Sequence, residues 1–75
     1  MTEKELLDNA LKRILYGMEK GDIRDIQVSL MQAKNAGLKN FNRDLENFLL
    51  KLNEERKVIL KLLPEEILKI SKLIL

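Results

Sequence analysis

The stretch that decides the fold is Lys20-Gly21-Asp22-Ile23, at residues 20–23 of this 75-residue chain. Glycine readily takes the left-handed backbone conformation that closes a helix, and aspartate is a preferred cap for the start of the next one. A junction of only two residues, Gly21 and Asp22, leaves no room for a long connection. It therefore predicts two consecutive helices that form an antiparallel or sharply angled hairpin.

The segment before this junction is predicted to be a helix over residues 3–20. Thr2 and Glu5 have the spacing of a capping box, in which each side chain accepts from a backbone N–H of the other residue. Gly17 is a weak point in its last turns, because glycine is a poor helix former. Apolar side chains recur at helical spacing along one side: Leu6, Leu7, Ala10, Leu11, Ile14, Leu15 and Met18.

The segment after the junction is predicted to be a helix over residues 23–36. Gly37 suits the left-handed residue that ends such a helix, and Leu38 is expected to fold back on Ala33. The predicted buried stripe consists of Ile23, Ile26, Leu30 and Ala33.

A third helix is predicted to start after Asn40 or Asn42, either of which can act as a cap. Five polar residues at 53–57 interrupt its apolar stripe, so the sequence allows one long helix to about residue 62 or a break near Asn53. Heptad spacing and the absence of Gly or Pro favour the long helix. The stripe consists of Phe41, Leu45, Phe48, Leu49 and Leu52, and it resumes at Val58, Ile59, Leu60, Leu62 and Leu63.

Pro64-Glu65-Glu66 predicts a kink or a new helix, since proline suits the first helical position and acids suit the first turn. A last helix is expected from about residue 64 to the end. The fold class is therefore all-α: a small bundle of three to four helices, forming a single domain over residues 1–75.

The residue types present argue against catalysis. The chain has no Cys and no His, which removes thiolate nucleophiles, the usual general base and the commonest metal ligands. Ser29 and Ser71 have no histidine to activate them, and no glycine-rich phosphate loop occurs. We expect a non-enzymatic, cytoplasmic protein with no cofactor, no metal, no small-molecule substrate and no membrane span.

The C-terminal helix is unusually apolar. Its apolar residues spread over roughly 220° of the helical wheel, and a surface helix needs about half of that. Either the helix is central and packs against helices one and three, or one side meets a protein partner or a second copy of the chain. The second interpretation predicts a non-catalytic interaction module whose interface draws on Leu68, Leu73 and Leu75, with Leu15 and Val28.

A basic elbow between the second and third helices supports an alternative function. Lys34, Lys39 and Arg43 lie there among asparagines, with no acidic residue between Asp25 and Asp44. Such groups can contact the phosphates of a nucleic acid. A net charge of +2 adds little to this interpretation, and a helix-turn-helix pattern is only partly met, because Arg43 falls where that motif needs an apolar residue.

Overall fold

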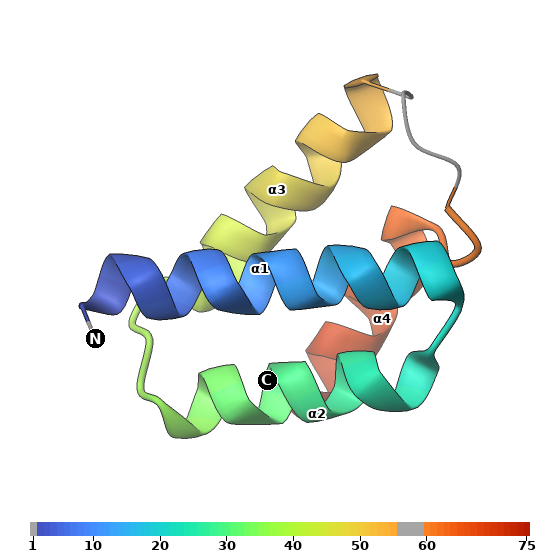
Figure 1. Cartoon of the computed structure of the whole chain (residues 1–75). Helices are drawn as coiled ribbons and strands as arrows, with labels where there is room; N and C mark the ends of the chain where they lie inside the picture. The colour runs from blue at the N-terminus through green and yellow to red at the C-terminus, as the bar shows by residue number, and fades with distance from the viewer. Residues whose placement is uncertain (1, 56–59) are drawn as a thin grey trace.

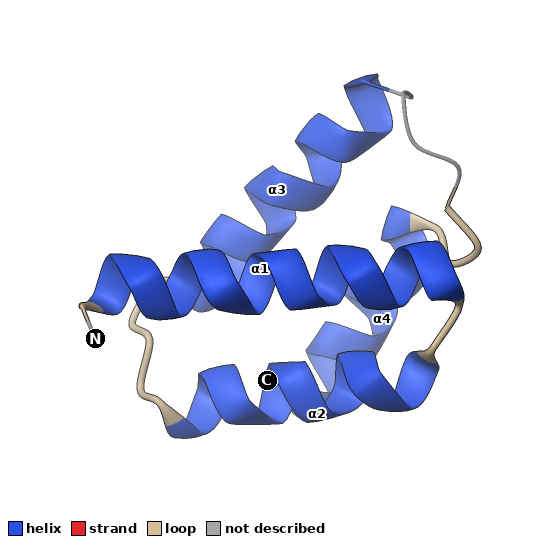
Figure 2. Ribbon diagram, in the orientation of Figure 1, coloured by secondary structure: helices blue, strands red, loops and turns tan. Residues whose placement is uncertain are grey.

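The computed structural model of the protein describes residues 2–55 and 60–75. Over these residues the chain forms four helices: α1 (Glu3–Lys20), α2 (Ile23–Asn35), α3 (Phe41–Glu55) and α4 (Pro64–Ile74). α1 and α2 lie side by side, α3 crosses behind α1, and α4 packs against both α2 and α3 (Figure 1). Every described element is a helix or a loop (Figure 2). The predicted all-α bundle, its hairpin and the new helix at Pro64 are confirmed.

The first two helices are capped at the predicted residues, and of the predicted Thr2–Glu5 capping box the structure shows the Thr2 half. The Thr2 hydroxyl accepts a hydrogen bond from the Glu5 N–H at 3.2 Å. Gly21 closes α1 in the left-handed region with φ 78°. The Asp22 carboxylate then accepts from the Asp25 N–H at 3.1 Å. The direction in which the chain reverses is thus fixed by short-range hydrogen bonds.

The Asp22 cap should contribute measurably to stability. We expect Asp22→Ala to lower the free energy of unfolding by about 1 kcal/mol, the usual cost of losing a helix cap. Urea unfolding followed by circular dichroism measures the change. Asp8→Ala, at an exposed position within α1, is the matched control and should change stability by less than about 0.5 kcal/mol. Equal losses in both variants would contradict the capping role.

The end of α2 also follows the predicted chemistry. α2 ends at Asn35, one residue before the predicted limit, and Gly37 has φ 71°. Leu38 is half-buried and packs against the core. The loop after α2 is short, and α3 begins at Phe41, directly after Asn40.

The core lies where the four helices meet. A close approach between α1 and α2 occurs at Gly17, where an added Cβ would lie 2.7 Å from Ile26 Cγ1. Gly17 is therefore a packing position, which the sequence did not reveal. The buried apolar residues are Ile14, Met18, Ile26, Leu30, Ala33, Phe41, Leu45, Leu49, Leu62 and Ile67.

The predicted long third helix is wrong at its far end. α3 continues through Asn53 to Glu55, but residues 60–63 are not helical. Instead the Lys61 and Leu62 N–H groups donate to the Met18 carbonyl at 3.0 and 3.1 Å. That carbonyl belongs to the last turn of α1, where the carbonyl groups have no N–H partner within the helix. The N–H groups of Lys61 and Leu62 therefore bond to α1 instead of to carbonyls of a continued third helix. The predicted stripe positions Val58 and Ile59, and residues 56–57 of the polar segment, lie outside the described residues.

Two packing expectations are also corrected. α4 has α2 and α3 as its main neighbours among the described residues, where helices one and three were expected. Ile67 and Ser71 face this interior. Ile23, predicted to be buried, is 46% exposed.

Candidate functional site

The end of α4 carries the most exposed apolar side chain of the described residues. Leu73 is 88% exposed, although Ser71 on the same helix is buried and Ile74 is half-buried. At about 100° per residue, Leu73 points away from the line of Ile67 and Ser71 that α2 and α3 cover. Part of the apolar surface of α4 is therefore left uncovered by its own chain.

A second apolar surface lies on α2, opposite its buried side. Arg24, Val28, Met31 and Asn35 are spaced by four, three and four residues, so they stack along one side of the helix. We call these four residues the outer ridge of α2. Its two central side chains are apolar and exposed, Val28 at 38% and Met31 at 54%.

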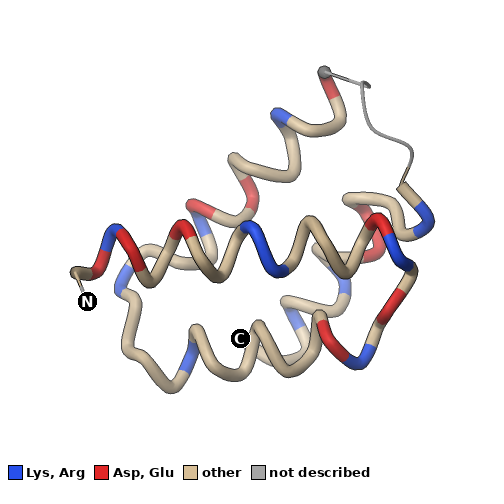
Figure 3. Tube along the Cα trace, in the orientation of Figure 1, with Lys and Arg blue, Asp and Glu red and all other residues tan. Residues whose placement is uncertain are grey.

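The outer ridge also lacks charge along its centre. Residues 26–33 contain no charged side chain and form the longest uncharged run in a chain with 35% charged residues. In Figure 3 the charged positions of α2 lie only near its two ends. A solvent-facing helix side usually carries charge, so this neutrality marks an unusual surface.

A hydrogen bond joins the two surfaces. Lys34 Nζ donates to the Ile74 carbonyl at 3.2 Å, which places the end of α4 beside the last turn of α2. Met31 lies one turn before Lys34, and Leu73 directly precedes Ile74, so both exposed residues belong to the helix ends that this bond brings together. We call the outer ridge together with Leu73 the α2–α4 face.

Other exposed apolar side chains are scattered over the described part of the chain. Leu50 lies on α3, Leu63 precedes α4 and Tyr16 lies on α1. The Tyr16 ring is approached by Lys20 Nζ, 4.3 Å from its centre. Single exposed apolar residues are normal on proteins, whereas a contiguous patch marks a contact surface. The α2–α4 face is therefore the strongest candidate.

The structure places the predicted interface residues at three different locations. Leu73 and Val28 belong to the α2–α4 face. Leu68 and Leu75 are half-buried and line a shallow groove toward α3, beside Asn42 and Glu46. Leu15 is half-buried on the side of α1 away from α2.

The prediction missed Met31. Two signals for it were present in the sequence: the uncharged run at 26–33, and the ridge spacing on the side opposite Ile26 and Leu30.

The basic elbow is exposed but mixed in charge. Lys34 is engaged with the end of α4, and Lys39 lines a shallow pocket together with Glu3 and Asp44. Arg43 is exposed on α3. Acids beside the basic groups weaken the attraction of a phosphate backbone, so nucleic-acid contact stays a prediction that the geometry does not favour.

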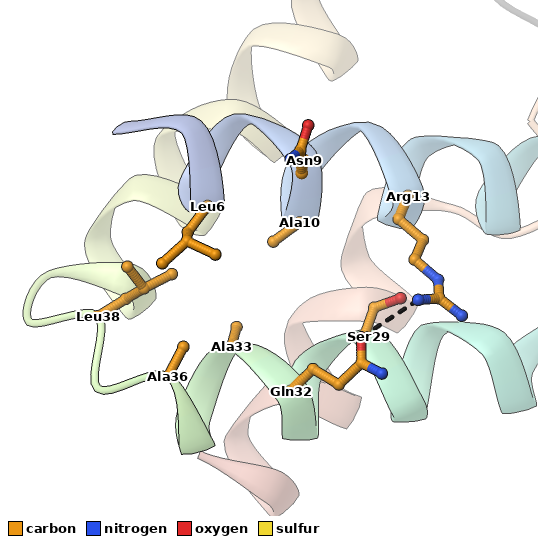
Figure 4. A pocket seen from close by; sticks show the side chains of 9 residues that line it. All are labelled: Leu6, Asn9, Ala10, Arg13, Ser29, Gln32, Ala33, Ala36 and Leu38. Atoms are coloured by element: carbon orange, nitrogen blue, oxygen red, sulfur yellow. Dashed lines mark hydrogen bonds between the residues drawn. The ribbon is translucent and has the colours of Figure 1, made fainter. Parts of the chain in front are cut away.

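A hollow of about 240 Å³ lies between α1 and α2 (Figure 4). Small side chains such as Ala10, Ala33 and Ala36 open it. At one end Arg13 donates to Asp25 Oδ1 at 3.1 Å and to Gln32 Oε1 at 3.1 Å. With its guanidinium engaged in this way, Arg13 connects the two helices, and the hollow offers no strong ligand group.

The described residues offer no group of three or more acidic residues placed to hold a metal ion. None of the described helices combines the length and apolar character needed to cross a membrane. Compared with protein-family models, curated proteins and solved structures, the chain matches none.

Proposed function

We propose that this chain is a non-catalytic protein-interaction module whose contact surface is the α2–α4 face. The observation that carries the proposal is the exposure of Leu73 beside an uncharged helix surface with Val28 and Met31 at its centre. Covering a single leucine side chain is worth about 2 kcal/mol. A partner that covers Val28 and Met31 gains apolar burial without desolvating a charge on the ridge itself, and Lys34, beside Leu73, keeps its hydrogen bond to the Ile74 carbonyl.

Site-specific photo-crosslinking in the source cells tests the proposal. A photoreactive amino acid is placed at Met31 or at Leu73 in the full chain. We expect a discrete crosslinked species from both positions, because a docked partner lies against each of them. Denaturing gel electrophoresis with mass spectrometry detects the species.

Asn47 provides the matched control. It is uncharged, exposed and on the side of α3 opposite the buried Leu45 and Leu49. The same photoreactive group at Asn47 should give no discrete species. Equal crosslinking from all three positions, or none from Met31 and Leu73, would refute the α2–α4 face as an interaction surface.

A further inference from the structure

The outer ridge of α2 is complementary to a second copy of the same ridge that runs in the opposite direction. Along the chain it presents a cation at Arg24, two apolar side chains at Val28 and Met31, and an amide at Asn35. A two-fold symmetric contact requires a surface that complements its own copy. If two ridges meet antiparallel, Val28 lies opposite Met31 twice, and Arg24 lies opposite Asn35 twice.

Charge complementarity supports this antiparallel arrangement. Arg24 is in the first turn of α2 and Asn35 is its last residue. Arg24 of one copy would therefore lie against the C-terminal end of the other α2, where the helix dipole favours a cation, while Lys34 in the same turn points to the Ile74 carbonyl of its own chain. A parallel two-fold arrangement would place Arg24 against Arg24, which costs energy.

From this self-complementarity we infer that the partner of the α2–α4 face is a second copy of this chain, with the two α2 helices packed antiparallel. The inference rests on the function proposed above and names its partner. The two-fold axis lies between Val28 and Met31, perpendicular to α2. Gln27 lies on one flank of the ridge, where its amide can donate and accept at the rim.

The same symmetry gives the end of α4 a partner. An axis perpendicular to α2 in the plane of contact keeps α4 on the same flank of both copies. Leu73, beside the last turn of its own α2, then lies next to the first turn of the other α2. The exposed apolar side chain in that first turn is Ile23, so the arrangement covers the residue whose burial the single chain leaves incomplete.

The area available predicts a weak dimer. α2 has 13 residues, which makes it about 20 Å long and about 10 Å wide. This surface alone is smaller than the roughly 800 Å² per partner of a standard interface. The contact area therefore has to include Leu73, and the dimer should dissociate on dilution.

Disulfide trapping tests the register directly. The chain has no cysteine, so an introduced one can bond only to another copy. We expect a mixture of Val28→Cys and Met31→Cys chains to form the mixed disulfide several-fold faster than either variant crosslinks with itself. Dominant same-residue disulfides would overturn the antiparallel arrangement. So would trapping no faster than that of the exposed control Asn47→Cys.

A charge exchange tests the same contact in solution. Arg24→Glu should weaken dimerisation at least tenfold, and adding Asn35→Lys to that chain should restore it. Neither change harms α2 itself, because an acid suits its first turn and a cation its last. Sedimentation equilibrium over a hundredfold concentration range measures the dissociation constant, and circular dichroism checks that the helix content is kept.

The outcomes separate this inference from the function on which it rests. Dimer formation with the mixed disulfide supports both. A chain that stays monomeric throughout, while Met31 photo-crosslinks to a different protein, overturns the second copy as partner and leaves the interaction module standing. A monomer with no crosslinked species overturns both.

Discussion

Ile67→Ala is expected to lower the free energy of unfolding by about 3 kcal/mol, because truncating a buried isoleucine to alanine removes apolar burial and leaves a cavity. Ile67 is fully buried on α4, the helix that packs against α2 and α3. A domain of 75 residues has a total stability of only about 4–11 kcal/mol. The variant should therefore unfold at a much lower urea concentration, which circular dichroism detects.

Leu73→Ala is the matched control on the same helix. The substitution removes a side chain of similar size, but from an exposed position, so the loss should stay below about 0.5 kcal/mol at low protein concentration. If the chain dimerises through Leu73, the loss grows as the protein concentration rises. Similar losses for Ile67→Ala and Leu73→Ala in dilute solution would contradict the exposure of Leu73.

The helix boundaries that the sequence predicted well are those set by local chemistry. α1 begins and ends at the predicted residues because Thr2 and Gly21 act within one turn of their own positions. Pro64 starts α4 for the same reason, since its ring fixes the backbone of that residue alone. Such signals need no knowledge of the rest of the fold.

The end of α3 was mispredicted because a tertiary contact decides the structure beyond it. The seven-residue spacing of Leu45 and Leu52 is a property of one helix and carries no information about neighbours. The hydrogen bonds from Lys61 and Leu62 to the Met18 carbonyl join segments more than forty residues apart. No periodic pattern reports such a contact.

The candidate site was predictable in part for a similar reason. The excess apolar surface of the last helix follows from its sequence, and Leu73 is where part of it remains exposed. Which side of the helix α3 covers depends on the packing, so Leu68 and Leu75 could not be separated from Leu73 in advance. Met31 was missed because the predicted apolar stripe marks only the buried side of α2, and Met31 lies on the opposite side.

Gly17→Ala is expected to lower the free energy of unfolding by about 2 kcal/mol, because overpacking a close contact usually costs 1–3 kcal/mol. At an ordinary helical position the same change stabilises by about 1 kcal/mol. Here the new Cβ would lie 2.7 Å from Ile26 Cγ1 and 3.4 Å from the Asp22 carbonyl. Ile26 is fully buried, so it has little room to move. Urea unfolding measures the sign of the effect, which distinguishes a packing glycine from a merely poor helix former.

The Ile26→Ala background tests the cause of that loss. This substitution removes the Cγ1 and Cδ1 atoms that the new Cβ would meet, so Gly17→Ala should then cost nothing or stabilise by up to about 1 kcal/mol. Gly37 offers a contrast, since a Cβ there would meet no atom within 4 Å and only its φ of 71° opposes a side chain. We therefore expect Gly37→Ala to cost about 1 kcal/mol in either background. If Gly17→Ala is equally harmful with and without the Ile26 side chain, then the contact between Gly17 and Ile26 is not what sets the distance between α1 and α2.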